Sequence, residues 1–410
     1  MTVKNVEVIG LGYIGLPTAV ALAGAGLKVK GVDTNPTHVD AVNAGKVPFL
    51  EPGLDEALRA VHERGMISAS TTPSEAEAYI ISVPTPFKGN HEADLSYVLA
   101  AADEISPYVA KGALVILEST SPPGTTELMA ERIEKNRPDL AGSLLFAHAP
   151  ERVLPGRIMV EIFDNDRIVG GLTSEASEAA RDLYATFCKG QIRMTNAKTA
   201  EMSKLAENSF RDVNIAYANE LAKICEKLGI DVWELIELAN LHPRVNILRP
   251  GPGVGGHCIA VDPWFIVDAA PELANLIRTA REVNDSRPDD VMAEVRTILS
   301  SLGWKEGDPV TLAALGLAFK PDVDDLRASP AITVAKKLAE LPGASVLVVE
   351  PNVDELPSGL AGLPNVLLVS LEEALSGAAA VVGLVAHKQF KALDRDSIKV
   401  PVLDTCGIWR

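Results

Sequence analysis

Short apolar runs recur along the first 195 residues, and each is followed by a turn rich in Gly, Pro, Asn or Asp and then by a helical stretch. The runs consist mainly of Val, Ile, Leu and Ala. They lie at residues 6–9, 29–32, 78–83, 114–117 and 144–147. Strands and helices that alternate in this way predict a parallel sheet whose two faces are covered by helices.

A long stretch without glycine or proline runs from Gln191 to Leu228. Within it, Lys204, Asn208 and Arg211 recur at the spacing of one helix face, so the whole stretch is predicted to be one long helix. Its apolar residues fall on more than one stripe. We therefore expect it to be buried between two partners, one of which is a second subunit.

Beyond this helix the strand–helix alternation returns. We expect helices at 231–239 and 273–284, a helix that starts at Ser329-Pro330, and strands at 310–315, 346–349, 366–369, 379–385 and 400–403. The predicted fold class is α/β, with two Rossmann-like parallel-sheet domains joined by a long-helix central domain. The predicted boundaries are 1–195, 196–302 and 303–410. The two end domains share an architecture, but no residue-level repeat is visible.

A glycine-rich turn joins the first predicted strand to a helix rich in Ala and Leu. Gly10, Gly12 and Gly15 allow a tight turn and let backbone N–H groups approach a pyrophosphate at the helix N-terminus. Asp33 ends the second predicted strand, where a carboxylate binds ribose hydroxyls and would repel a 2′-phosphate. The turn therefore predicts NAD rather than NADP. The alternative is a structural turn with a solvated Asp33.

A second glycine-rich loop carries the candidate nucleophile. Cys258 ends the run Pro-Gly-Pro-Gly-Val-Gly-Gly-His-Cys, and Asp262 follows about one helical turn later. A thiol and a carboxylate beside a nicotinamide suggest the covalent capture of an aldehyde, although a lone cysteine is more often a small buried hydrophobe. The other three cysteines keep that structural interpretation: Cys188, Cys225 and Cys406.

Polar residues on the long helix and after the strands complete the candidate site. Lys204 and Asn208 share one helix face and could donate to an oxygen that becomes negative during the reaction; the alternative is a solvated face. Ligands collect at the carboxyl ends of parallel strands. We therefore expect Thr120 and Glu151 to hold water there, and the turn that contains Thr85 to lie against the cofactor.

The charge balance excludes several partners. The 410 residues include 38 Lys and Arg and 55 Asp and Glu, for a net charge of −17, which disfavours nucleic acid and anionic membranes. No apolar run approaches the roughly 18 residues of a membrane span, and the N-terminus lacks a signal-peptide pattern. The four scattered cysteines indicate a reducing compartment and no zinc site. We expect a cytoplasmic protein without a metal.

Seven ordered motifs resemble the UDP-glucose/GDP-mannose dehydrogenase family over essentially the whole chain. They lie at residues 10–15, 83–86, 118–125, 150–152, 201–220, 251–262 and 316–330. The family oxidises the C6 alcohol of a nucleotide sugar to a carboxylate with two NAD. The resemblance implies a UDP-sugar as substrate, held by the C-terminal domain, and a homodimer or higher homo-oligomer through the central helix.

The resemblance also implies roles for individual residues. Cys258 is similar to the nucleophile, Lys204 and Asn208 to the oxyanion donors, and Asp262 to the residue that handles the hydroxyl proton. Glu151 and Thr120 match positions that serve thioester hydrolysis. Further implied cofactor contacts are Tyr13, Ile14, Thr85, Thr120 and Arg327. Further implied substrate contacts are Glu151, Arg152, Arg211, Arg244, Gly255, His257 and Lys320, with Arg244 offered to the neighbouring subunit.

Departures from the UDP-glucose pattern indicate a branch of the family. His257 stands where Ser or Tyr is usual, Val261 stands where Lys is usual, and Cys406 stands where Arg is usual. The segment resembles the members that act on UDP-N-acetylhexosamines, closest to those that act on UDP-N-acetyl-D-mannosamine. UDP-N-acetylglucosamine and UDP-glucose remain alternatives. So do a two-electron dehydrogenase of the β-hydroxyacid type, which has no use for Cys258, and a non-enzymatic NAD or nucleotide-sugar sensor.

Overall fold

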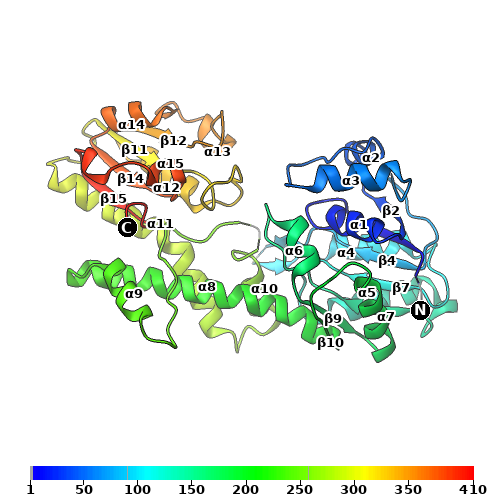
Figure 1. The fold of residues 1–410 in the computed structure, drawn as a ribbon. Helices are drawn as coiled ribbons and strands as arrows, with labels where there is room; N and C mark the ends of the chain where they lie inside the picture. Colours follow the sequence, from blue (N-terminus) through cyan, green and yellow to red (C-terminus); the bar gives the residue numbers. More distant parts are fainter. Residues whose placement is uncertain (1–2, 90, 257) are drawn as a thin grey trace. The chain divides into compact units, whose positions relative to one another are not determined.

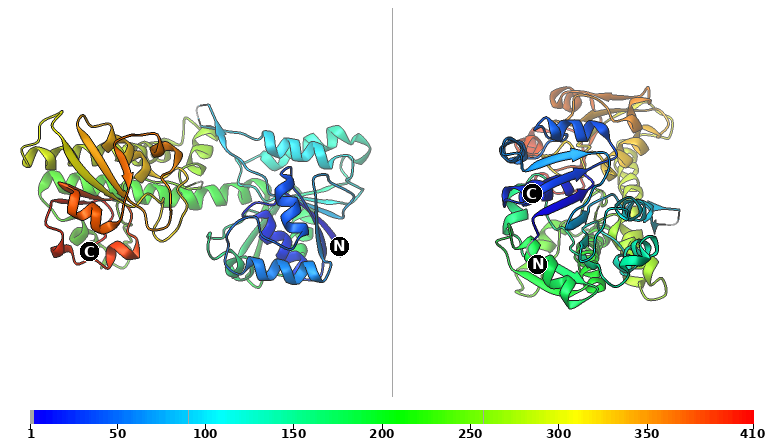
Figure 2. Two further views of the ribbon diagram at one scale, coloured as in Figure 1. Left: turned by 90° about the horizontal axis from the view of Figure 1, so that it is seen from above. Right: turned by 90° about the vertical axis from the view of Figure 1, so that its right-hand side faces the viewer.

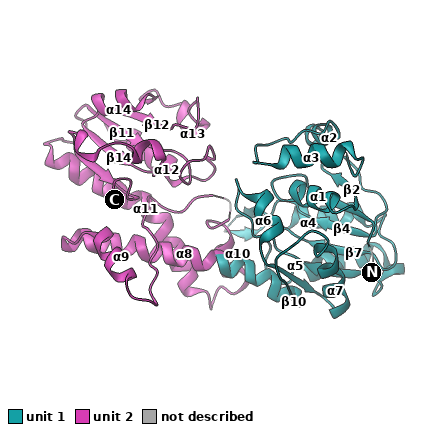
Figure 3. Ribbon diagram, viewed as in Figure 1, with its two compact units in different colours: residues 1–207 teal, residues 208–410 magenta. Residues whose placement is uncertain are grey.

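The computed structural model describes residues 3–89, 91–256 and 258–410. The chain divides into two compact units, residues 1–207 and 208–410 (Figure 3). Each unit contains a largely parallel sheet flanked by helices, which confirms the predicted α/β class (Figure 1). Helix α8 (Ala197–Leu228) is continuous across the boundary between the units.

The first unit is built on an eight-stranded sheet in the order β10-β9-β8-β7-β4-β1-β2-β3. The five predicted runs are all strands, with ends that differ by a residue or two from those expected. The order of the strands reverses between β1 and β4, so the turns after these two strands flank the crevice where such sheets bind ligands. The strands are β1 (Asn5–Ile9), β2 (Lys28–Val32), β3 (Ile67–Ser70), β4 (Ala78–Ile81), β7 (Leu114–Leu117), β8 (Leu145–His148), β9 (Arg167–Gly171) and β10 (Ile192–Asn196).

Helices cover both faces of this sheet, because alternate strand residues point to opposite sides. On one face Val6 and Val8 of β1 pack in a buried cluster with residues of α1, α3, α6 and α7. On the other face Ile9 packs with α4 and α5, drawn cyan to turquoise in Figure 2. The helices are α1 (Gly15–Gly24), α2 (Pro36–Asn43), α3 (Leu54–Glu63), α4 (Ser96–Ile105), α5 (Thr125–Asn136), α6 (Ile158–Asp164) and α7 (Ser174–Tyr184). A short hairpin, β5 (Phe87–Lys88) with β6 (Glu92–Ala93), follows β4.

In the described residues, the second unit contains the C-terminal part of α8, seven further α-helices and a five-stranded parallel sheet in the order β13-β12-β11-β14-β15. Ser329 caps α12 through a bond from the Ala331 N–H, which confirms the predicted helix start. The strands are β11 (Val310–Leu315), β12 (Ala344–Val349), β13 (Val366–Leu368), β14 (Ala380–Gly383) and β15 (Val402–Asp404). The helices are α9 (Val232–Asn240), α10 (Asp262–Ala269), α11 (Asn275–Ser301), α12 (Pro330–Ala339), α13 (Ser358–Ala361), α14 (Leu371–Gly377) and α15 (Lys388–Lys391).

Three expectations need correction. The stretch from Gln191 is not helical throughout, because Ile192–Asn196 pairs with β9 as strand β10 before α8 begins. Strand β8 runs antiparallel to β9, so the first sheet is not parallel at every pair. Helix α11 continues to Ser301 with Pro288 inside it, well beyond the expected end.

No helix in the described part of the chain is long and apolar enough to cross a membrane.

The close approach of the turn after β1 to the end of β4 predicts a loss of stability when Gly10 is replaced. Gly10 has φ +97°, and a Cβ there would lie 2.3 Å from the Ser82 carbonyl oxygen, whereas Gly26 has φ +96° and open space. Both Gly10→Ala and Gly26→Ala carry backbone strain, but only the first also meets a clash. We predict that Gly10→Ala lowers the free energy of unfolding by about 1–3 kcal/mol more than Gly26→Ala, measured by urea denaturation. Equal losses of unfolding free energy in the two variants would contradict the close approach of Gly10 to the Ser82 carbonyl.

Candidate active site

The turn between β1 and α1 has the shape that a dinucleotide pyrophosphate requires. The Gly10 N–H donates to the Val32 carbonyl at 2.7 Å, which ties the turn to the end of β2. A Cβ at Gly15 would lie 1.9 Å from the Gly10 oxygen, so a side chain is excluded there, while the space above Gly12 is open. The residues present therefore fit a bound NAD, whose pyrophosphate would lie over Gly12 at the N-terminus of α1.

The carboxylate of Asp33 is held at the rim of this turn. It accepts hydrogen bonds from the Leu11 and Asn35 N–H groups, both at 2.8 Å, and the His38 ring nitrogen lies 3.4 Å away. Tyr13 stacks on Phe49 with ring centroids 4.2 Å apart. Ile14 immediately precedes α1. All the predicted cofactor contacts of this motif therefore gather at one end of β1 and β2.

The second unit repeats this turn, which the sequence analysis did not anticipate. Gly316 has φ +96°, its N–H donates to the Val349 carbonyl at 2.8 Å, and the Leu317 N–H donates to Glu350 at 2.7 Å. These bonds match those of Gly10 and Leu11 in kind. In the second unit, however, the Glu350 carboxylate is fully buried and pairs with the His387 ring at 3.1 Å. Burial opposes ionisation of Glu350, but the hydrogen bond with His387 contributes to a pKa that is lower than usual. The two end domains therefore share a residue-level feature at this turn, although their sequences show no residue-level repeat.

The loop after this second turn carries two predicted contacts. The Lys320 ammonium lies 5.5 Å from the centroid of the Phe319 ring. The exposed Arg327 pairs with Asp325 through two hydrogen bonds, at 2.8 and 2.6 Å. Arg244 is also exposed, beyond α9. Arg244 and Arg327 are thus exposed cations, whereas Lys320 is half-buried.

Thr120 and Glu151 lie in loops that follow strands β7 and β8 of the first unit. The Thr85 hydroxyl donates to the Thr120 carbonyl at 2.6 Å, which joins the turns after β4 and β7. Glu151 follows β8 and is 9% exposed. Its two oxygens accept from the Arg152 N–H at 2.7 Å and from the Arg167 guanidinium at 2.5 Å.

Arg152 itself is directed toward the long helix. Its guanidinium donates to Glu207 at 2.7 Å and also to the Asp166 carbonyl. Lys204, on the same helix, is 8% exposed. The structure therefore does not support the alternative of a solvated face around Lys204, and Glu201 is buried as well, accepting from Gly124 and Thr126.

Asn208 and Asp262 are brought together in the second unit. The Asn208 amide donates to the Asp262 carboxylate and accepts from Arg211, and both Asn208 and Asp262 are buried. The Asp262 N–H donates to the Cys258 carbonyl at 2.8 Å, so the cysteine and the carboxylate are separated by one helical turn. The Cys258 side chain is exposed.

A cluster of buried polar side chains joins α8 to α11. We call this cluster the polar seam, and its members are Asp212, Asn219, Arg281, Asn284 and Arg287. Each of these side chains is at most 3% exposed. Arg281 pairs with Asp212 at 2.6 Å, and Asn284 bonds to both Asp212 and Asn219. Burial raises the pKa of Asp212, although the Arg281 cation opposes the shift.

The seam also holds the start of the cysteine loop. The Gly251 N–H donates to the Asn219 side chain at 2.9 Å, and Arg287 donates to the Gly251 carbonyl at 3.1 Å. Pro288 lacks an N–H and leaves the Asn284 carbonyl without its helical donor. That oxygen would lie 3.2 Å from a Cβ at Gly253.

The other glycines of the loop allow close contact with the loop between β11 and α12 of the same unit. A Cβ at Gly255 would lie 2.6 Å from the Ala328 carbonyl oxygen, and one at Gly256 would lie 3.1 Å from the Phe319 ring. His257 lies outside the described residues. The glycine-rich sequence is thus explained by packing on both sides of the loop as well as by any ligand.

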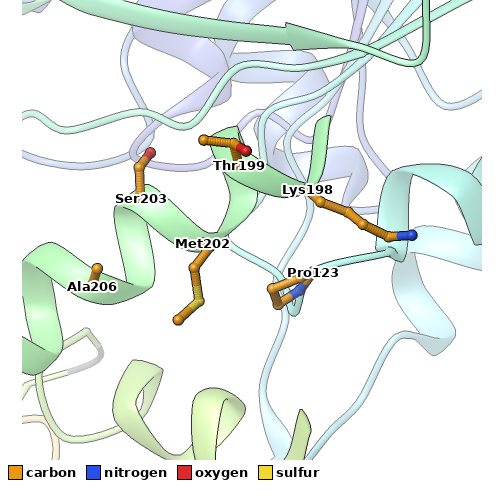
Figure 4. A pocket seen from close by; sticks show the side chains of 6 residues that line it. All are labelled: Pro123, Lys198, Thr199, Met202, Ser203 and Ala206. Atoms are coloured by element: carbon orange, nitrogen blue, oxygen red, sulfur yellow. The ribbon is translucent and has the colours of Figure 1, made fainter. Parts of the chain in front are cut away.

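The remaining cysteines and one pocket lie apart from these groups. Cys225 is buried, Cys188 is half-buried, and burial raises the pKa of the Cys406 thiol. A pocket of about 390 Å³ lies beside the first turns of α8 (Figure 4). Its described lining contains none of the predicted site residues. The lining residues are Pro123, Lys198, Thr199, Met202, Ser203 and Ala206.

Sequence reasoning missed Arg167 and the polar seam. Arg167 could have been found from the sequence, because it begins the short and otherwise apolar segment of β9. The charged residues of α11 carried no signal for the second, because their burial depends on the partner helix. Both networks were found only from the geometry.

The fold and the Gly10 turn define an α/β protein that binds a dinucleotide, and comparison with known proteins gives the family. Family models match residues 4–188 as the NAD binding domain, 198–286 as the central domain and 313–410 as the UDP binding domain. The chain belongs to the UDP-glucose/GDP-mannose dehydrogenase family. It is thus an NAD-dependent nucleotide-sugar dehydrogenase, and the resemblance and the predicted cofactor are both confirmed.

Individual relatives are similar over their whole length. The chain is 53% identical to the UDP-N-acetyl-D-mannosamine dehydrogenase of Escherichia coli (strain K12), with 100% of both chains covered. It is 52% identical to the NDP-N-acetyl-D-galactosaminuronic acid dehydrogenase of Ralstonia nicotianae, covering 99% of this chain and 96% of that protein. The structure of UDP-D-ManNAc dehydrogenase from Pyrococcus horikoshii gives a TM-score of 0.90 at 39% identity, covering 99% and 96% of the two chains.

The buried carboxylate of Glu118 predicts a pH-dependent stability. Burial, and then the charge of Glu151, raise the pKa of Glu118 from 4.5 to about 7. The folded state therefore holds a proton that the unfolded chain has released, and the stability that this proton contributes is lost as pH rises from 4.5 to about 7.

Glu118→Gln removes this titration. We predict that the free energy of unfolding of the native chain, minus that of the variant, falls over this pH interval by up to about 1.4 kcal/mol per pH unit and then levels off. Urea denaturation of both proteins across the interval measures the difference. A difference that stays constant with pH would contradict the assignment.

Proposed function

We propose that the chain oxidises the C6 alcohol of UDP-N-acetyl-D-mannosamine to the carboxylate through a thiohemiacetal and a thioester on Cys258. The observation that carries the choice of substrate is the 53% identity, over both full lengths, to a relative named for this sugar. The Gly-Gly-His-Cys segment and Val261 support an N-acetylhexosamine over glucose. The similarly related N-acetylgalactosaminuronic acid enzyme keeps other amino sugars as alternatives.

The roles of the residues follow from where charge develops. Bound at the Gly10 turn, NAD would supply the hydride acceptor for each of the two oxidations. Lys204 and Asn208 would stabilise the C6 oxygen as it becomes negative, and Asp262 with Lys204 would take the hydroxyl proton through water. The thiolate of Cys258 adds to the aldehyde carbon, and the aldehyde oxygen takes up a proton.

Hydrolysis completes the reaction. After the second oxidation C6 is a thioester, and water held by Glu151 and Thr120 attacks its carbonyl carbon. The C–S bond breaks, the sulfur leaves as the thiolate of Cys258, and the carboxylate is released. One alcohol, two NAD⁺ and one water give one carboxylate, two NADH and three protons.

The remaining proposals concern substrate contacts and assembly. We assign substrate binding to Arg152, Arg211, Gly255, Lys320 and, for the neighbouring subunit, Arg244, and cofactor contacts to Thr85 and Arg327. We retain the division at 1–195, 196–302 and 303–410 and a cytoplasmic location. A homodimer or higher oligomer is supported by exposed apolar side chains along α8: Phe210 is 68% exposed, Tyr217 52% and Ile224 45%.

A substrate comparison with limiting sugar tests the proposal. UDP-N-acetyl-D-mannosamine, UDP-N-acetylglucosamine, UDP-glucose and GDP-mannose are each supplied with NAD, and NADH is counted per sugar consumed. We predict that UDP-N-acetyl-D-mannosamine gives the highest kcat/KM and two NADH. In Cys258→Ser the rate of the complete reaction should fall by orders of magnitude, because a hydroxyl is a far weaker nucleophile at neutral pH.

Cys188→Ser is the matched control, since its half-buried thiol donates to the backbone carbonyls of Asn165 and Gly190, which a hydroxyl can also reach. It should retain the native rate. One NADH per sugar would support the two-electron alternative, and an unchanged rate in Cys258→Ser would remove this cysteine from the mechanism.

A further inference from the structure

A buried cluster in the first unit places one cation between two carboxylates. Arg167 on β9 is 4% exposed; its Nη2 donates to Glu151 at 2.5 Å, and its Nη1 lies 3.7 Å from Glu118. The Tyr184 ring lies under the guanidinium at 4.4 Å, and its hydroxyl donates to Glu118 at 3.0 Å. The Thr18 hydroxyl, from the nucleotide-binding helix α1, also donates to Glu118.

Stability alone is a poor explanation for this cluster. Burying three ionisable groups is costly, and apolar residues of similar volume often stabilise a protein equally well or better. The cluster is also not saturated, because Arg167 Nη1 has no hydrogen-bond partner within the described part of the chain. A buried cation that is left incompletely bonded beside a predicted site residue is typical of a functional arrangement.

The contacts of Glu151 show what Arg167 does. One carboxylate oxygen accepts from Arg167 and the other from the Arg152 N–H, so the plane of the carboxylate is fixed from both sides. Each oxygen keeps a second lone pair that can accept from water. Removal of the guanidinium would leave only the backbone donor, and the carboxylate could then rotate.

Resting on the proposed function, in which Glu151 holds the water that cleaves the Cys258 thioester, we propose that Arg167 is the positioning residue that orients Glu151 for this hydrolysis. As the water oxygen bonds to the thioester carbon, its proton passes to the oriented Glu151 oxygen, and the sulfur leaves with the C–S electron pair. Arg167 itself transfers nothing. It acts only on the step after both oxidations.

Glu118 competes with Glu151 for the same cation. The side chains that face Glu118 are Arg167, Glu151, Tyr184 and Thr18. When Glu118 is protonated the charge of Arg167 acts mainly on Glu151, and when Glu118 ionises that charge is shared. Hydrolysis by the native enzyme should therefore slow as pH rises through about 7, where Glu118 titrates.

Intact-protein mass measurement on the quenched reaction tests the assignment. The full chain is mixed with NAD and UDP-N-acetyl-D-mannosamine, and the adduct on Cys258 is followed together with NADH. In Arg167→Lys, which keeps the charge but loses the fork geometry, we predict a normal burst of two NADH per site, an accumulated thioester, and a kcat reduced by about 100-fold with little change in KM. Glu151→Gln should behave in the same way.

Tyr184→Phe is the matched control, because it removes one bond to Glu118 and keeps the ring beneath the guanidinium. It should show no accumulated adduct. A different pair of results would show that Arg167 has only a structural role and that the assignment is wrong. In that case Glu151→Gln accumulates the thioester, whereas Arg167→Lys accumulates none and slows the NADH burst and the turnover equally. If Glu151→Gln forms neither burst nor adduct, the proposed function fails and the assignment fails with it.

Glu118→Gln provides a second measurement if Arg167→Lys does not fold. In this variant no charge at position 118 competes for Arg167, so the guanidinium acts on Glu151 alone. The hydrolysis rate should therefore become independent of pH near neutrality. A pH dependence like that of the native enzyme would overturn the assignment.

Discussion

The buried polar seam between α8 and α11 determines where the candidate nucleophile lies in the second unit. Asp212, Asn219, Arg281 and Asn284 bond mainly to one another, because a buried polar group that loses its partner costs about 1–3 kcal/mol. This requirement admits very few alignments of the two helices. The Gly251 N–H is bonded by the same Asn219, so the alignment of the helices also fixes the start of the loop that ends at Cys258.

The same loop is held at its other end and along its side. Asn208 binds Asp262 at the beginning of α10, and the glycines between the two ends pack against Phe319 and Ala328 of the loop between β11 and α12. An exposed thiol thus lies on a segment with few degrees of freedom, which is what a nucleophile needs in order to meet a carbon at one defined place. In the first unit, Arg167 fixes Glu151 by a comparable use of buried charge.

The sequence predicted the fold class, ten of the strands and the dinucleotide turn, because these depend on local periodicity and on glycine. It missed β3, β9, β10 and the hairpin of β5 and β6; the residues of β10, for example, alternate weakly and are mostly exposed. It also could not show that β8 and β9 are antiparallel. The polar seam and the Arg167 cluster were beyond its reach, because an arginine or asparagine is recognised as buried only when its partner on another element is known. Pro288 illustrates the same limit, since tertiary contacts keep α11 helical through it.

Hydrogen exchange on Asn219→Ala tests most directly whether the seam holds the cysteine loop. We expect amides at 251–262 to exchange about 10- to 100-fold faster than in the native chain, while those of β11 and β14 are unchanged. Asn365→Ala, which removes bonds to the Ala339 and Ala344 carbonyls elsewhere in the unit, should leave the loop unaffected. Unaltered exchange at 251–262 in Asn219→Ala would show that the seam does not hold the cysteine loop.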